Sequence, residues 1–152
     1  MNDVLATFRK CGALLEGHFV LTSGLHSNRY LQCAKVLQYP DLAEACGAGV
    51  AALFHSEAPT VVIGPAIGGI VIAQEVGRAL RVRALFAERE NGVMTLRRGF
   101  ELRDNERVLV VEDVITTGGS AREVLEMAAA RGAGVVCVGC IIDRSDGQAC
   151  FS

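Results

Sequence analysis

The stretch Arg107-Val108-Leu109-Val110-Val111-Glu112-Asp113-Val114-Ile115-Thr116-Thr117-Gly118-Gly119-Ser120 decides the fold of this 152-residue chain. It begins with an aliphatic run, Val108 to Val111, that has no polar face. Such a run is typical of a strand buried on both sides in a parallel sheet. Two adjacent carboxylates, Glu112 and Asp113, follow where that strand is expected to end. Because open α/β sheets bind ligands at the carboxyl ends of their strands, we expect these carboxylates at the mouth of a site.

The second half of the stretch is a small hydroxyl- and glycine-rich loop that opens into a helical pattern at residues 121–127. Backbone N–H groups and hydroxyls in such a loop can surround a phosphate at the positive end of the helix. Each part alone also fits an ordinary strand, a solvated acidic turn and a capped helix. The order of strand, acidic pair and loop favours a phosphate cradle beside two carboxylates that can bind vicinal hydroxyls. A ribose 5-phosphate has the phosphate for the cradle and the hydroxyls for the carboxylates. The loop residues are Thr116, Thr117, Gly118, Gly119 and Ser120.

Composition indicates one domain without a nucleic-acid or membrane partner. At 152 residues and 51% hydrophobic content, the chain is long enough for one well-buried domain and too short for two. A formal net charge of -2 gives no general attraction to nucleic acid or anionic membranes. Without a membrane-length apolar run or a signal-like start, we expect a cytoplasmic protein with reduced cysteines. Cys137 and Cys140 share a predicted strand and are expected to face opposite sides, which disfavours a zinc or redox role.

The first forty residues predict a small lobe in front of the main sheet. A short amphipathic helix is expected over Val4–Lys10, capped by Asp3, and short strands with a tight turn are expected up to Gly24. Residues 25–32 carry many polar and ring side chains. That segment fits either the wall of a site or an irregular surface hairpin.

The middle of the chain predicts a long helix and then a strand, a glycine-rich loop and a second helix. The long helix is expected from Pro40 to about His55. The strand covers residues 59–64, and the loop Gly64-Pro65-Ala66-Ile67-Gly68-Gly69 leads into a helix at residues 70–78. Such a loop is a second potential anion site. The long helix is expected to bury an apolar stripe of Leu42, Cys46, Val50 and Leu53.

The remaining pattern completes an α/β fold with a mainly parallel central sheet flanked by helices. A third strand is expected at residues 82–86 and a last one at 134–142. Between the third strand and the stretch at 107–120, residues 87–98 break the hydrophobic period with charged side chains. We interpret that segment as an exposed, mobile loop or hairpin.

The stretch at 107–120 resembles the phosphoribosyl diphosphate (PRPP) signature of the type I phosphoribosyltransferases. Residues 64–69 fall where that family carries its pyrophosphate loop, and residues 87–98 fall where its flexible catalytic loop lies. Residues 12–27 and the pair Asp143-Arg144 look like the N-terminal region and the base-site arginine of orotate phosphoribosyltransferases. The resemblance implies a single domain over residues 1–152 with a small N-terminal hood lobe. This domain is shorter at its C-terminus than in most members of the family.

The resemblance also implies an activity. PRPP would donate its 5-phosphoribosyl group to N1 of orotate, giving orotidine 5′-monophosphate and pyrophosphate. Mg²⁺ would arrive with PRPP and lie near Glu112 or Asp113, without a preformed metal cage. A homodimer is implied in which the loop at residues 87–98 reaches the neighbouring active site. The alternatives are a PRPP-binding regulatory protein on the same fold and a purine phosphoribosyltransferase.

Residue roles follow from the same resemblance. Asp113 and Arg89 are the expected catalytic residues, and Glu112 joins Asp113 on the ribose hydroxyls. The 5-phosphate is expected on Thr116, Thr117, Gly118, Gly119 and Ser120. Pyrophosphate is expected on the backbone of Ala66, Ile67, Gly68 and Gly69, with Arg89 and with Arg97 or Arg98. Orotate is expected to meet Arg144, Thr116 and His26, and at His26 the family commonly has a lysine.

Overall fold

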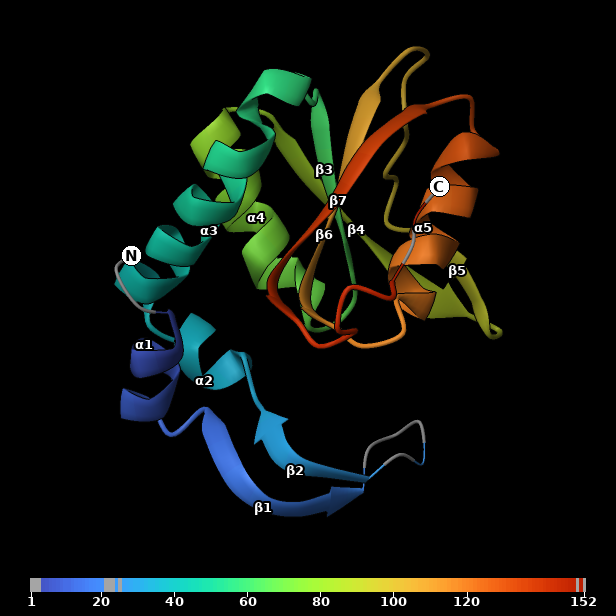
Figure 1. Cartoon of the computed structure of the whole chain (residues 1–152). Helices are drawn as coiled ribbons and strands as arrows, with labels where there is room; N and C mark the ends of the chain where they lie inside the picture. The colour runs from blue at the N-terminus through green and yellow to red at the C-terminus, as the bar shows by residue number, and fades with distance from the viewer. Residues whose placement is uncertain (1–3, 21–23, 25, 150, 152) are drawn as a thin grey trace.

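A computed structural model describes residues 4–20, 24, 26–149 and 151. At its centre is a five-stranded sheet with the strand order β5-β4-β3-β6-β7 (Figure 1). The pairs β4–β3, β3–β6 and β6–β7 are parallel, and the short edge strand β5 runs antiparallel to β4. The prediction of an α/β fold with a mainly parallel sheet is therefore confirmed. The strands are β3 Val61–Pro65, β4 Arg83–Glu90, β5 Val93–Thr95, β6 Arg107–Ile115 and β7 Gly134–Asp143.

Helices cover both faces of this sheet, with α3 and α4 on one face and α5 on the other (Figure 1). The central strand β6 is buried on both sides, and residues 108–111 have no exposed surface. This confirms the predicted doubly buried strand. The strand is longer than expected, because β6 continues to Ile115 and so includes Glu112 and Asp113. The helices are α3 Pro40–Phe54, α4 Gly69–Leu80 and α5 Gly119–Ala129, and a short 3-10 helix, His55–Glu57, follows α3.

Most of the stripe predicted for α3 is confirmed, since Cys46 and Val50 are buried and Leu42 packs partly buried against the core. A Cβ atom at Gly47 would lie 2.5 Å from Cβ of Glu75 on α4, so the two helices pack in close contact. Leu53 was expected to be buried, and this was wrong, since it is 73% exposed. Cys46, seven residues earlier and only about 20° away around the helix, is buried, so the exposure of Leu53 goes with its place in the last turn of α3. The buried residues of α3 are Ala43, Cys46, Gly47, Val50 and Ala51.

The predicted hood lobe consists of helix α1, a two-stranded hairpin and helix α2, within residues 4–37. Figure 1 shows the hairpin standing apart from the main sheet. The lobe is attached through Phe8, which is fully buried in the cluster that also contains α3 and α4. The cap expected at Asp3 and part of the expected turn, at Leu21–Ser23, lie outside the described residues. The elements are α1 Val4–Lys10, β1 Leu14–Val20, β2 His26–Leu31 and α2 Ala34–Leu37.

The segment at residues 87–98 was expected to be a mobile loop or a hairpin, and it forms a hairpin. Strand β4 runs beyond the predicted end at residue 86 and pairs with β5 in the register Arg89 opposite Met94. The turn residues Asn91 and Gly92 both have positive φ, at 52° and 83°. An Asn-Gly pair favours this kind of two-residue hairpin turn. The hairpin is anchored by its inward side chains, because Ala87 and Met94 are buried in the cluster beneath α5.

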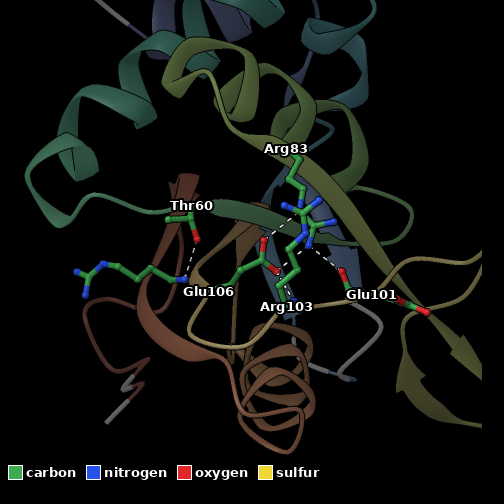
Figure 2. A network of polar contacts seen from close by, with 6 residues as sticks. Thr60, Arg83, Glu101, Arg103 and Glu106 are labelled. Carbon is green, nitrogen blue, oxygen red and sulfur yellow. Dashed lines mark hydrogen bonds and ion pairs between the residues drawn. The ribbon is translucent and has the colours of Figure 1, made fainter.

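A buried carboxylate fixes the end of the sheet opposite to the predicted site (Figure 2). Glu106 is only 8% exposed and accepts hydrogen bonds from Nε and Nη2 of Arg83, at 3.0 and 2.6 Å. The backbone N–H of Arg103 donates a third, at 2.7 Å. Burial alone would raise the pKa of Glu106, but these hydrogen bonds outweigh it and lower the pKa. The pair joins the beginnings of β4 and β6 and leaves their carboxyl ends to the site.

Composition predicted reduced cysteines and no apolar run of membrane-spanning length. Cys11, Cys33, Cys46, Cys137 and Cys140 are all free thiols, as expected, and Cys150 lies outside the described residues. Among the helices that the structure describes, none has the length and apolar character needed to cross a membrane.

Candidate active site

The predicted phosphate loop lines a cavity of about 380 Å³ at the carboxyl end of β6. Glu112 from β6 and Arg89 from β4 line the same cavity. Strand β4, strand β6 and helix α5 therefore bring together residues that are far apart in the sequence. All five predicted phosphate-binding residues take part, namely Thr116, Thr117, Gly118, Gly119 and Ser120.

The backbone of the loop is shaped by Gly118. It has φ of 75°, in the left-handed region that disfavours side chains, and it immediately precedes α5. Its carbonyl accepts the first hydrogen bond of the helix, from Arg122 N at 2.9 Å. Gly119 and Ser120 belong to the first turn of α5 and not to a separate loop, which corrects the predicted boundary. First-turn N–H groups have no partner within their own helix, so this turn suits an anion.

The two carboxylates lie on opposite sides of β6. Glu112 lines the phosphate cavity, whereas Asp113 approaches the glycine-rich loop at Gly68. A Cβ atom at Gly68 would be 2.8 Å from both carboxylate oxygens of Asp113. Oδ1 of Asp113 also accepts a hydrogen bond from the N–H of Val114, at 2.8 Å. The pair thus connects the phosphate loop with the predicted pyrophosphate loop.

Burial changes the protonation of both carboxylates. It raises the pKa of Glu112 to about 8, and the neighbouring charge of Asp113 adds to the shift. Burial also raises the pKa of Asp113, although the N–H of Val114 opposes this rise. At neutral pH Glu112 is therefore mostly protonated in the ligand-free chain. A bound cation would favour the ionised forms of both carboxylates.

The glycine-rich loop after β3 brings its backbone close to β6. A Cβ atom at Gly69 would lie 2.9 Å from the carbonyl oxygen of Val111, and one at Gly64 would lie 2.3 Å from the carbonyl oxygen of Gly69. These contacts explain the glycines, since a side chain would push α4 away from the sheet. The exposed part of the loop is Ile67, at 85%, and Gly68. The peptide bond before Ile67 is cis.

One predicted pyrophosphate contact is already engaged elsewhere. The N–H of Ala66 donates to the carbonyl oxygen of Ala87 at 2.7 Å, continuing the pairing of β3 with β4. That N–H cannot serve pyrophosphate without breaking a sheet hydrogen bond. The backbone donors that suit an anion are therefore those of Ile67, Gly68 and Gly69.

Of the three predicted loop arginines, the structure places only Arg89 on the phosphate cavity. Its guanidinium donates to both oxygens of Glu123 on α5, at 2.6 and 2.8 Å, and to the carbonyl of Gly92 at 3.0 Å. Arg97 and Arg98 instead form ion pairs with Glu88 and Glu90, within the hairpin and its flank. Sequence reasoning missed Glu123. Its position three residues after Ser120, on the same face of α5, was the available signal.

The predicted base-site arginine connects the main sheet with the hood lobe. Arg144 directly follows β7, and its backbone N–H donates to the carbonyl of Ile115 at 2.8 Å. Its Nη2 donates to Oγ of Ser27 at 2.8 Å and to the carbonyl of Arg29 at 3.2 Å. Residues 26–31 are thus both a hairpin strand and a wall facing Arg144. Ser27 was not among the predicted site residues, and only the polar character of its segment indicated a role.

His26 lies beside Ser27 on the same strand of the hood. Its Nδ1 is 2.7 Å from Nε2 of His18 on β1, so the two imidazole rings share a hydrogen bond. Both rings line a small cavity of about 230 Å³. Thr116, the other predicted orotate contact, lines the phosphate cavity.

Comparison with known proteins identifies the class and then the family. Residues 34–149 match the phosphoribosyl transferase domain family. Over 146 residues the chain is 60% identical to orotate phosphoribosyltransferase from Pelotomaculum thermopropionicum, covering 96% of this chain and 77% of that protein. It is 58% identical to orotate phosphoribosyltransferase from Heliobacterium modesticaldum, covering 99% and 80%. The chain belongs to the orotate phosphoribosyltransferase family.

Solved structures show the same fold. The crystal structure of orotate phosphoribosyltransferase from Aeropyrum pernix superposes with a TM-score of 0.77 at 22% identity, covering 95% of each chain. The structure of UMP synthase from Leishmania donovani gives a TM-score of 0.81 at 21% identity, covering 94% of this chain and 31% of that one. These similarities support the type I phosphoribosyltransferase fold with its mainly parallel central sheet.

Proposed function

We propose that this chain transfers the 5-phosphoribosyl group of PRPP to N1 of orotate, releasing pyrophosphate and forming orotidine 5′-monophosphate. The observation that carries the proposal is the cavity in which Glu112 and Arg89 join the hydroxyl- and glycine-rich loop at 116–120. A 5-phosphate fits the N-terminal turn of α5, and ribose hydroxyls fit the carboxylates beside it. Family membership supplies the acceptor, because the close relatives are named orotate phosphoribosyltransferases.

The reaction is a substitution at C1 of the ribose. Orotate N1 forms a bond to C1, the bond from C1 to the pyrophosphate oxygen breaks, and the N1 proton is lost. Positive charge develops on the ribose ring and negative charge on the leaving group. Fixed charges and N–H dipoles aimed at these groups lower the barrier. We assign stabilisation of the positive ribose ring to Asp113 and Glu112. We assign stabilisation of the negative pyrophosphate to Arg89 and the backbone N–H groups of residues 67–69.

Asp113 is the carboxylate that we assign to proton handling. It lies between β6 and the glycine-rich loop, close to Gly68. Its raised pKa brings it closer to the pH at which a carboxylate accepts a proton efficiently. Glu112, whose pKa burial raises to about 8 in the ligand-free chain, would be ionised beside the cation that PRPP carries and would then accept hydrogen bonds from the ribose hydroxyls.

The carboxylates also fit a divalent cation carried by PRPP. Glu112 and Asp113 offer hard oxygen donors, which Mg²⁺ prefers, and a bound cation would counteract the burial that raises the pKa of each carboxylate. Among the described residues there is no cluster of three or more His, Cys, Asp or Glu side chains placed to hold a metal. Most Mg²⁺ ligands would therefore be phosphate oxygens and water. When bound, Mg²⁺ would neutralise charge on the departing pyrophosphate.

Arg144 is the group that we assign to the orotate carboxylate, with Thr116 and His26 near the base. A purine has no carboxylate to pair with this arginine, which argues against a purine acceptor. A PRPP-binding regulator would use the same phosphate loop without turnover. One assay separates these functions: PRPP-dependent consumption of orotate, followed by absorbance, beside hypoxanthine, adenine and uracil. Orotate alone should be consumed, and no consumption of any base would overturn the proposal.

We further propose a homodimer in which the hairpin at residues 87–98 closes over the neighbouring active site. The tip suits a contact between subunits, because Asn91 and Gly92 are exposed and Val93 is 67% exposed. Sharing requires the ion pair of Arg89 with Glu123 to open, and its side chains are 48% and 37% exposed. Exposed ion pairs contribute about 0–1 kcal/mol and bidentate geometry adds to this, so contacts made in the dimer would have to offset the opening of this pair. Closure would exclude water from the reacting ribose.

A further inference from the structure

The hydroxyl of Ser27 is the centre of a small hydrogen-bond network between the hood and Arg144. It accepts a hydrogen bond from Nη2 of Arg144 at 2.8 Å, a long-range contact between β2 and the segment after β7. It also donates to the carbonyl of Arg29 at 2.7 Å and accepts from the N–H of Arg29 at 3.2 Å. The same carbonyl accepts a second bond from Nη2 of Arg144, at 3.2 Å.

The chemistry of a hydroxyl gives these contacts a fixed direction. Ser27 has one O–H hydrogen and two lone pairs. The short bond to the carbonyl of Arg29 uses the hydrogen, so both lone pairs point toward donors. One of those donors is the cationic guanidinium of Arg144, and hydrogen bonds to charged groups are stronger than neutral ones. Because its hydrogen is engaged by the carbonyl of Arg29, Ser27 presents a lone pair to the guanidinium of Arg144.

The backbone of Arg144 is fixed independently of the hood. Arg144 lies at the end of β7, and its backbone N–H is bonded to Ile115 at the end of β6. A long side chain in this position has several rotamers, and ordering it costs conformational entropy. The two contacts from the hood select one rotamer before any ligand arrives. They engage Nη2 and leave the Nε and Nη1 edges outside these two bonds.

We infer that Ser27 is a positioning residue that sets selectivity for a carboxylate-bearing base by holding the guanidinium of Arg144 in place. The inference rests on the proposed function, in which Arg144 pairs with the orotate carboxylate. Ser27 acts through Arg144 and not on the phosphoribosyl donor, whose cavity is lined by the loop at 116–120. Its loss therefore weakens orotate binding and leaves PRPP binding almost unchanged.

Steady-state kinetics of Ser27→Ala test this inference. The KM for orotate should rise about tenfold, as expected when a hydrogen bond to a charged group is lost, and the KM for PRPP should change less than twofold. Ser27→Thr keeps the hydroxyl and should recover most of the loss. The matched control is Ser145→Ala, since Ser145 adjoins Arg144 and its hydroxyl accepts from the N–H of Ala149. That variant should resemble the wild type.

A double-mutant cycle distinguishes positioning from a general effect on the hood. In the Arg144→Ala background, Ser27→Ala should cause no further rise in the KM for orotate, because its partner is already absent. Equal increases in the KM for orotate and PRPP, additive effects with Arg144→Ala, or a Ser27→Ala protein that behaves as Ser145→Ala would each overturn the inference. A wild-type protein that consumes no orotate would instead overturn the proposed function, so the two failures are distinguishable.

Discussion

Gly68 and Asp113 lie so close that a Cβ atom at position 68 would stand 2.8 Å from both carboxylate oxygens. This contact joins the glycine-rich loop after β3 to the carboxylate on β6. The loop assigned to pyrophosphate therefore has no room for a side chain at position 68 while the carboxylate assigned to ribose stays in place. A substitution at position 68 is expected to displace Asp113.

Gly68→Ala should lower kcat/KM by roughly two orders of magnitude, because the added methyl group displaces the Asp113 carboxylate from the ribose. The effect should be catalytic and not global, since Gly68 is itself exposed and its φ of -58° suits alanine as well as glycine. Kinetics and thermal melting of the same preparation measure both. Gly49→Ala is the control, because Gly49 is also exposed, its φ is not in the left-handed region and no atom would lie within 4 Å of the added methyl group. A Gly68→Ala enzyme with wild-type activity would contradict the assignment.

Asp113→Asn should reduce kcat by about 10²-fold or more while the protein stays folded, because the amide cannot accept the proton or favour the cationic ribose. The N–H of Val114 can still donate to the amide oxygen, so the local backbone should persist. Single-turnover kinetics and circular dichroism test the two parts. Unchanged turnover in a folded variant would remove Asp113 from the mechanism.

Because of Glu112, the free energy of unfolding should decrease as the pH rises. Its pKa is about 8 in the folded chain, above its ordinary value of 4.5. Between these values the folded state binds more protons than the unfolded state, so stability falls as pH rises through this window. Glu112→Gln cannot ionise, so its stability advantage over the wild type should be larger at pH 9 than at pH 5, by roughly 4 kcal/mol.

Denaturant unfolding at several pH values measures that difference. The control is Asp104→Asn, an exposed carboxylate at the opposite end of the sheet. A difference between Glu112→Gln and the wild type that stays constant from pH 5 to pH 9 would show that Glu112 is ionised throughout.

Arg144→Ala should raise the KM for orotate and spare PRPP. Leaving the orotate carboxylate unpaired in a half-buried site costs roughly 2–5 kcal/mol, which predicts at least a thirtyfold increase. The KM for PRPP should change less than twofold, since the phosphate cavity does not include Arg144. Initial rates with each substrate varied in turn provide the measurement. Parallel increases for both substrates would assign Arg144 to the fold instead.

Subunit mixing tests whether the hairpin serves a neighbouring chain. Arg89→Ala and Asp113→Asn proteins, each inactive alone, are combined after subunit exchange has been verified by mass. If Arg89 acts in the neighbouring subunit, a mixed dimer contains one site with both defects and one intact site, so activity should recover. If Arg89 serves the cavity that it lines in its own chain, both sites stay damaged. Absence of recovery would refute the shared site.

The sequence was most informative where a pattern is local. The aliphatic run of β6, the glycine-rich turns and the Asn-Gly hairpin signal each reflect a short-range physical rule, and the corresponding elements are present. The five residues of the phosphate loop are consecutive, so one turn of chain brings them together.

Long-range partners could not be predicted in the same way. Glu123 becomes a site residue only because β4 extends far enough to bring Arg89 across α5, and Ser27 only because the hood reaches the end of β7. The burial of α3 was predicted in part for a related reason. The hydrophobic pattern indicated Cys46 and Val50 correctly, but it could not show that α4 approaches closely enough at Glu75 to require glycine at position 47.

Strand β4 belongs partly to the parallel sheet and partly to the hairpin, and this division affects which changes of length the chain can tolerate in evolution. Residues 83–87 pair with β3 inside the parallel sheet, whereas residues 88–90 pair only with β5 in the hairpin. Insertions or deletions at the Asn91-Gly92 turn would change the length of an external ribbon and leave every parallel strand pairing of the sheet intact. Natural selection can thus adjust the reach of the segment that we propose to close over the site without changing the parallel sheet.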